Sequence, residues 1–290
     1  MSACRFDPQA LCPFYSSNVN PMVATRSFAY SKRAALWVNT EALKRNSVEI
    51  ISEKYGNDIF HNLSHQDNSL LLLDSGLPSQ DSSIAIVNPE TWCICGPGEC
   101  GEIWVSTTWN CPGYSEGFPI KNLETQLRYY RTGDRGFLWP IAKMTEGDES
   151  AVKSGWKSYY ENNKYLTLAL FVIGPYSREL IFNGLRHPID DLEKTVESCS
   201  SHIPVDGCII FPHNSSTICA VEIDKPENMV ITSNQISLAL LKRHRIAVDT
   251  IAFVQTGMLA KSRMKEKQRS KVAIAFHLGK LPVKGLIHTH

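Results

Sequence analysis

Short apolar runs alternate with turn-forming residues along the first two thirds of the chain, and this pattern predicts β-strands. Ser-Gly, Asn-Pro and Gly-Pro-Gly turns separate several of the runs at spacings of ten to twenty residues. The predicted strands are Ala35–Val38, Leu70–Leu73, Ile84–Val87 and Ile103–Val105. A single helical turn over residues 40–45, with Thr40 as its N-cap, is predicted to follow the first of them.

The pattern changes at about Gly174, where helical and strand periodicities begin to alternate. It predicts helices over 190–198, 233–244 and 265–278, and strands over 207–211, 217–223 and 250–255. In the first helix, Leu192, Val196 and Cys199 form one apolar stripe. The predicted fold class is therefore α+β: a β-rich domain over residues 1–173, followed by a small α+β domain over residues 174–290.

The composition excludes a disordered chain and argues against nucleic-acid-binding and membrane-spanning proteins. The chain has 290 residues, of which 43% are hydrophobic and 20% charged, so disorder is excluded. Thirty Lys and Arg balance 29 Asp and Glu, which argues against a nucleic-acid partner. No apolar run approaches the roughly 20 residues that span a bilayer, and the N-terminus lacks the apolar core of a signal peptide. We therefore expect a soluble, cytoplasmic protein without a transmembrane segment, in which the nine cysteines are reduced thiols.

Two groups of potential metal ligands have unsuitable spacing. Cys93, Cys95, Cys100 and Cys111 lack the paired C-x2-C arrangement of zinc sites, so we interpret them as thiols at strand ends. His61 and His65 lie four residues apart in a polar, turn-like segment without the Glu of an H-E-x-x-H motif. No metal ligand is predicted.

A basic cluster near the C-terminus places six cations within eleven residues. Its members are Lys261, Arg263, Lys265, Lys267, Arg269 and Lys271. Such a cluster can bind phosphate groups. The interleaved Ser, Met, Glu and Gln residues equally favour a solvated face, and both interpretations remain open.

The segment that most specifically indicates a binding function is Thr132-Gly133-Asp134. A turn at the end of a strand would project the Asp134 carboxylate from a tight bend. A carboxylate in that position can accept hydrogen bonds from both hydroxyls of a ribose. The alternative is an ordinary β-turn aspartate.

These residues also carry a family resemblance. Gly101–Val105, with Gly113-Tyr114 eight residues later, and Tyr130–Gly136 resemble the motifs of the acyl-adenylate-forming (AMP-binding) superfamily. Further segments are similar to the fungal relatives of disco-interacting protein 2, whose domains are similar to fatty acyl-AMP ligases: Asn20–Ser27, Ile86–Thr91, Asn183–Leu185, Asp191–Glu193 and Glu266–Arg269. The resemblance runs from about Cys12 to Lys271 and covers the C-terminal half of one adenylation domain, so it implies a truncated adenylation subdomain followed by a lid domain.

The resemblance implies an ATP-dependent ligase that activates a fatty acid or another carboxylate as an acyl-adenylate. It implies ATP or AMP and Mg²⁺ as cofactors, although no Mg²⁺ ligand is identified, and it leaves open whether CoA is a further substrate. Asp134 matches the ribose-binding aspartate, Thr132 lies beside it in the motif, and Tyr15 matches an aromatic residue against adenine. Lys267 and Lys265 are the candidates for the catalytic lysine, because Glu266 occupies its expected position.

The chain also departs from the family. Val19 stands where the family has a metal-associated Glu, and Pro175 replaces an Arg of the hinge. The loop that holds the β- and γ-phosphates is expected upstream of this sequence. Three hypotheses follow: a ligase that needs an upstream adenylation half, a non-catalytic nucleotide- or protein-binding module of the same fold, or an incomplete gene model of a longer protein.

Overall fold

The computed structural model describes residues 12–18, 20–26, 33–55, 68–79, 82–107, 117–142, 166–214 and 216–289. The chain divides into two compact units, Met1–Ser177 and Arg178–His290. Val19, His61, His65, Cys111 and Gly113-Tyr114, on which some of the sequence predictions fall, lie outside the described residues.

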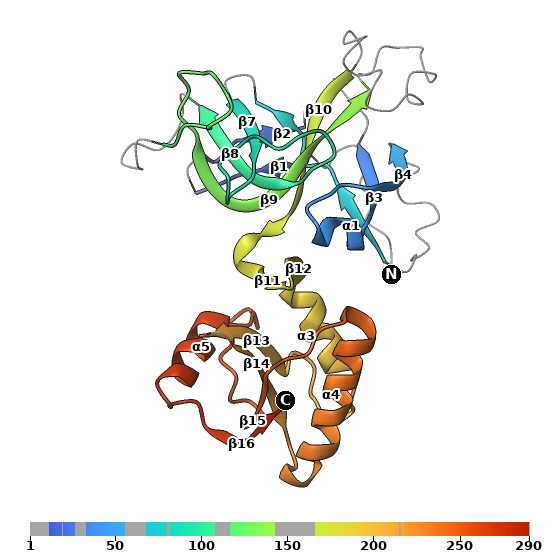
Figure 1. Cartoon of the computed structure of the whole chain (residues 1–290), viewed down its shortest axis with the longest axis vertical. Coiled ribbons are helices and arrows are strands. Elements are labelled where there is room, and N and C mark those ends of the chain that lie inside the picture. Colours follow the sequence, from blue (N-terminus) through green and yellow to red (C-terminus); the bar gives the residue numbers. More distant parts are fainter. Residues whose placement is uncertain are drawn as a thin grey trace, which may run out of the picture. The chain divides into compact units, whose positions relative to one another are not determined.

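The first unit is built from three sheets whose strand pairs are antiparallel (Figure 1). One contains β1 (Phe14–Tyr15), β2 (Ala24–Thr25) and β6 (Leu77–Pro78); another contains β4 (Ile50–Tyr55), β3 (Ala34–Asn39) and β5 (Ser69–Leu73). The third has the order β10 (Leu166–Pro175), β9 (Tyr130–Ala142), β8 (Gly101–Thr107) and β7 (Ser82–Val87). The four strands predicted from apolar runs lie within β3, β5, β7 and β8 and are confirmed.

The predicted helical turn is helix α1 (Thr40–Lys44), but its predicted cap is wrong. Asn39 is the N-cap, and its side-chain Oδ1 accepts the backbone N–H of Glu41 at 3.0 Å. Asn39 ends β3 with an extended backbone, whereas Thr40 is already helical, so only Asn39 is placed to accept that hydrogen bond.

The core of the first unit forms where β9 and β10 pair. The rings of Phe137 and Phe171 stack with centroids 5.3 Å apart and planes at 6°. Both residues belong to a buried cluster that includes Leu36, Val38 and Ile141. This cluster joins the sheet of β3 to the sheet of β9 through apolar burial.

The second unit places helices on both faces of one mixed sheet (Figure 1). The sheet order is β13 (Cys208–His213), β14 (Ser216–Ile223), β15 (Thr250–Gln255) and β16 (Val283–His288). The helices are α3 (Ile189–Ser198), α4 (Met229–His244) and α5 (Arg269–His277), and a hairpin of β11 (Glu179–Phe182) and β12 (Leu185–Pro188) precedes them. Short 3-10 helices cover Tyr176–Arg178 and Pro226–Asn228. The sequence predictions missed β16 and the hairpin.

Successive side chains of β13 point to opposite faces of this sheet. Cys208 and Ile210 pack in the cluster that contains Leu192 of α3. Ile209 and Phe211 pack in the cluster that contains Val272 of α5. Helices α3 and α4 therefore cover one face and α5 covers the other. Among the described residues, none of the helices combines the length and the apolar character needed to cross a membrane.

We predict that Gly136→Ala destabilises the first unit by about 2 kcal/mol, because an added methyl group would overlap fixed neighbours. A Cβ at Gly136 would lie 2.5 Å from the carbonyl oxygen of Phe171 and 2.8 Å from Cδ1 of Ile103. Urea denaturation of the variant measures the effect. Gly96→Ala is the control, because its Cβ would meet only the Glu99 side chain at 3.6 Å. Equal stability of the two variants would contradict the prediction.

Candidate functional site

A bulge in β9 shapes the candidate site. Glu102 of β8 pairs with Arg135, and Trp104 pairs with Arg131, so Ile103 alone lies opposite the three residues Thr132, Gly133 and Asp134. Gly133 has φ of 79°, in the left-handed region that favours glycine. The predicted turn at a strand end is therefore wrong: the segment is a bulge inside a strand that continues to Ala142.

The bulge brings three predicted site residues together. The Tyr15 hydroxyl donates to Asp134 Oδ2 at 2.6 Å, although the two residues lie 119 positions apart. Thr132 Oγ1 accepts the backbone N–H of Asp134 at 3.1 Å and donates to the carbonyl oxygen of Ile103 at 2.8 Å. Asp134 itself is half-buried. Tyr15 thus holds the carboxylate of Asp134, and Thr132 holds its backbone.

Tyr15 is buried, with 8% of its surface exposed. Burial raises the pKa of its phenol well above the usual range, and the hydrogen bond to Asp134 raises it further. The phenol therefore stays protonated at neutral pH and acts as a donor to Asp134. An ionised carboxylate has about four lone-pair sites on two oxygens, so it can accept further donors beside Tyr15.

Glu102 is a site residue that the sequence analysis missed. Its carboxylate is buried and accepts Arg131 Nε at 2.9 Å, Trp104 Nε1 at 3.1 Å and the backbone N–H of Gly133 at 3.2 Å. The guanidinium of Arg131 also lies 5.8 Å from the ring centroid of Trp104. Glu102 therefore fixes both sides of the bulge. Its position could have been noticed in the sequence, since Glu102 is an acidic residue inside an apolar strand. A buried charge requires partners, so such a residue is a candidate for a structural or functional role.

Lys267, a candidate catalytic lysine, lies in the second unit and is bound by two carboxylates of α3. Its Nζ lies 2.9 Å from Glu193 Oε2 and 2.6 Å from Glu197 Oε1, and its side chain is 12% exposed. Burial alone would lower the pKa of Lys267, but the hydrogen bonds to Glu197 and Glu193 outweigh this effect and raise it. The ammonium group is thus neutralised within its own unit.

Lys265, the other candidate, is exposed at a tight turn. Ser262 N–H donates to the carbonyl oxygen of Glu266 at 2.8 Å, and Lys265 N–H donates to that of Ser262 at 2.9 Å. Lys265 has φ of 64°, which a helix does not accommodate. The predicted helix over 265–278 therefore begins too early, since α5 starts at Arg269.

Glu193 organises this part of the second unit. It is 1% exposed and accepts the backbone N–H of Ile210 at 3.0 Å, Arg269 Nε at 3.0 Å and Lys267 Nζ. Arg269 also pairs with Asp190. Lys267 and Arg269, two of the six cations in the basic cluster, are therefore engaged by α3 and are compensated before any phosphate approaches.

The described residues contain no group of three or more His, Cys, Asp or Glu side chains that could hold a metal ion. No Mg²⁺ ligand set can thus be assigned within that part of the chain. Burial raises the pKa of the Cys95 thiol to about 12, so this cysteine stays protonated and is a poor metal ligand at neutral pH.

The second unit is similar to a known family of domains. Residues 178–285 match the family model described as Disco-interacting protein 2-like, AMP domain. The match covers most of the second unit. The predicted resemblance is confirmed, and the homologues of the chain are disco-interacting protein 2 and its fungal relatives.

Two fungal relatives extend the similarity beyond this domain. An uncharacterized protein of Schizosaccharomyces pombe is 27% identical over 284 residues, which is 94% of this chain and 17% of the relative. The Homeostatic regulator of DAG of Saccharomyces cerevisiae is 27% identical over 263 residues, which is 83% of this chain and 14% of the relative. The chain therefore spans less than a fifth of the length of either protein.

The fold itself is that of part of an adenylation domain. A solved structure from a study of fatty acyl-adenylate ligases of E. coli and L. pneumophila aligns with a TM-score of 0.60 and 14% sequence identity. The alignment covers 95% of this chain and 43% of that structure. The expected α+β, sheet-rich class is confirmed.

We predict that Lys267→Met destabilises the second unit by about 1–2 kcal/mol at pH 7, because hydrogen bonds to buried carboxylates are lost. Folding raises the pKa of Lys267, so its contribution is complete below the unfolded-state pKa of about 10.4 and is lost as pH rises through the higher folded value. Urea denaturation at increasing pH should therefore show a shrinking difference between variant and parent.

Lys194→Met is the matched control for this prediction, because Lys194 lies exposed on the same helix. Its effect should stay below about 0.5 kcal/mol. An equal loss in the two variants would show that the Glu193–Lys267–Glu197 contacts do not stabilise the unit.

Proposed function

We propose that this chain is part of an acyl-adenylate-forming, ligase-like protein and that it binds an adenine nucleotide through Asp134. The observation that carries this proposal is the Asp134 carboxylate, held in the β9 bulge by Tyr15 and Thr132. We assign residues 1–173 as a partial adenylation subdomain and residues 174–290 as the lid domain. Similarity to fatty acyl-adenylate ligase structures supports the fold on which this assignment rests.

Each residue of the site has a distinct role in this proposal. The ribose hydroxyls donate to the Asp134 carboxylate, and Thr132 fixes the backbone from which that carboxylate projects. Tyr15 has little exposed ring surface for stacking against adenine. Its hydroxyl instead positions Asp134 Oδ2 and directs further hydrogen bonding towards the remaining acceptor sites of the carboxylate.

Catalysis by the chain alone has weaker support. In acyl-adenylate formation, a carboxylate oxygen attacks the α-phosphorus of ATP and pyrophosphate leaves, so cations must offset the developing negative charge. Lys267 already compensates Glu193 and Glu197, and Pro175 provides no cation. These observations favour a non-catalytic binding module over a complete ligase for this chain.

A ligase remains the second candidate function, with an upstream adenylation half providing the loop that holds the β- and γ-phosphates. In that case the substrates are ATP and a fatty acid or another carboxylate, and CoA is a possible acceptor. Mg²⁺ would be held by groups other than the residues that the structure describes. The fatty acyl-adenylate ligase fold supports this class of substrate, and the relative named Homeostatic regulator of DAG supports a role in lipid metabolism.

We predict that the chain binds AMP and that Asp134→Asn weakens binding at least about tenfold, because an amide replaces one acceptor oxygen by a donor. Isothermal titration calorimetry with AMP measures the change. Asp206→Asn, outside the Tyr15–Asp134 contact, is the control and should bind like the parent. Undetectable AMP binding, or equal binding by the two variants, would contradict nucleotide recognition by Asp134.

We further predict that the chain alone does not exchange labelled pyrophosphate into ATP in the presence of fatty acids of different lengths. The reason is that Glu193 and Glu197 neutralise Lys267, so its charge is not available to stabilise the leaving pyrophosphate. Exchange by the isolated chain would refute the module hypothesis, and exchange only after addition of an upstream half would favour the ligase.

A further inference from the structure

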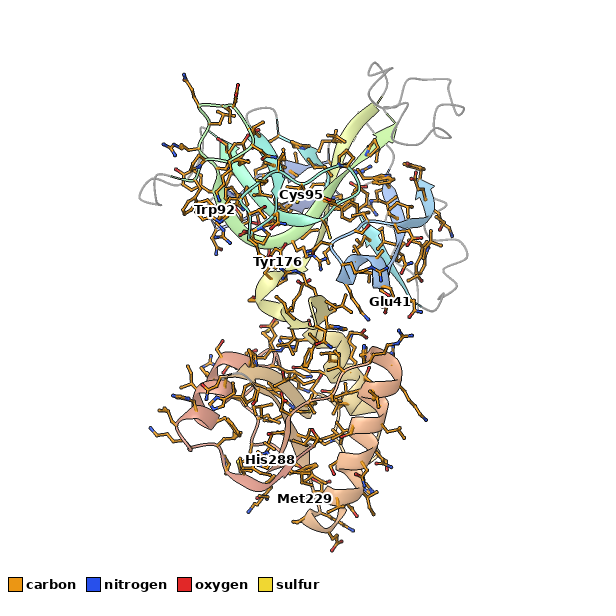
Figure 2. All side chains as sticks on the ribbon, in the orientation of Figure 1. Glu41, Trp92, Cys95, Tyr176, Met229 and His288 are labelled. Carbon is orange, nitrogen blue, oxygen red and sulfur yellow. The ribbon has the colours of Figure 1, made fainter. Side chains whose placement is uncertain are left out.

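The outer face of helix α4 carries more large apolar surface than its packing in the second unit requires. Its exposed apolar residues are Val230, Ile231, Leu238 and Leu241, with exposed fractions of 64%, 58%, 52% and 56%. Its buried residues are Thr232, Ser233, Ile236, Leu240 and His244. Side chains of α4 extend both towards the sheet and away from it (Figure 2). Large exposed apolar residues grouped on one side of a helix are typical of an interaction site.

The exposed residues follow the spacing of a coiled-coil seam. Ile231, Asn234, Leu238 and Leu241 are separated by three, four and three residues, and all four are exposed. This is the alternation of a and d positions that places side chains against a facing helix. The single Asn within the seam is typical of the polar positions that fix register and orientation at a cost in stability. The expected partner is therefore another helix.

The charges at the two ends of α4 indicate that the partner helix is α4 of a second copy of the chain. Exposed Glu227 lies in the 3-10 helix that precedes α4, and exposed Lys242 and Arg245 lie at the C-terminal end of α4. When two copies pair antiparallel, Glu227 of each lies next to Arg245 of the other. The same register places Ile231 beside Leu241 and Asn234 beside Leu238. The surface is thus complementary to itself, as a two-fold symmetric interface requires.

We propose that two copies of this chain associate through antiparallel pairing of the outer faces of α4. A single helix pair buries less than the standard interface of about 1,600 Å², so the dimer is weak and forms in the micromolar range.

Sedimentation velocity of the 290-residue chain from about 1 μM to about 200 μM tests the proposal. We expect a concentration-dependent dimer whose dissociation constant rises at least about tenfold in Leu238→Glu, because a charge enters the apolar seam. Leu278→Glu is the control, since Leu278 is 56% exposed directly after α5 and outside the seam. Its dissociation constant should match that of the parent.

A charge exchange tests the antiparallel register. Glu227→Arg and Arg245→Glu should each weaken the dimer, and the double exchange should restore it, because opposite charges face each other again. A monomer at every concentration, a dimer indifferent to Leu238→Glu, or a double exchange that fails to restore association would each overturn the proposal. Binding of the monomer to phosphatidylserine vesicles, abolished by Leu238→Glu, would instead assign the face to a membrane.

Discussion

The first unit depends on one irregularity in strand pairing, the bulge of β9 opposite Ile103. Beyond the bulge, β9 remains paired with β8 on one side and β10 on the other, so the extra residues cannot be absorbed by a slip in register. A side chain at Gly136 would overlap the carbonyl oxygen of Phe171, so glycine at this position permits that double pairing. The excess length is therefore confined to Thr132, Gly133 and Asp134, which places a carboxylate at a fixed point beside Tyr15.

The two units use a buried glutamate in comparable ways. Glu102 binds Arg131 and the backbone of Gly133, and Glu193 binds Lys267, Arg269 and the backbone of Ile210. A buried carboxylate without such partners is costly, so each glutamate constrains the segments that compensate it. In the first unit this constraint shapes a candidate ligand site. In the second unit it occupies Lys267, a candidate catalytic lysine, which is consistent with the proposed lack of catalysis.

The pattern of apolar and polar residues was sufficient to predict helices and strands that are bounded by turn residues and bury a continuous run or stripe of apolar side chains. The runs within β5, β7 and β8 belong to this class, as do α3 and the strands β13, β14 and β15. Strand β16 lies at the edge of its sheet and alternates exposed with half-buried residues, so its apolar signal is weak. The predicted helix start at Lys265 failed because a left-handed residue and the contacts of Lys267 with α3 override the local periodicity.

The candidate site was likewise only partly predictable, because its main contacts join residues that are far apart in the sequence. The resemblance placed Tyr15, Thr132 and Asp134 in one site, and the hydrogen bonds among them are consistent with that grouping. No local pattern reports that Tyr15 is buried with its hydroxyl on Asp134, since the two are far apart in sequence. Likewise, Lys267 and Glu193 lie 74 positions apart, so the neutralisation of the lysine becomes visible only in the folded unit.

The orientation of α4 illustrates why exposed apolar surface requires an explanation of its own. The helix leaves Leu238 and Leu241 exposed, whereas the polar residues Ser233 and His244 are buried. Thr195 of α3 fixes this choice, because its hydroxyl lies 2.7 Å from His244 Nε2 in a buried hydrogen bond. Rotating the helix to cover Leu238 and Leu241 would break that bond and expose Ile236, which is fully buried. Folding of the second unit therefore determines the orientation of α4 and leaves its outer apolar seam without a role inside the unit, as expected for a surface that packs against a partner.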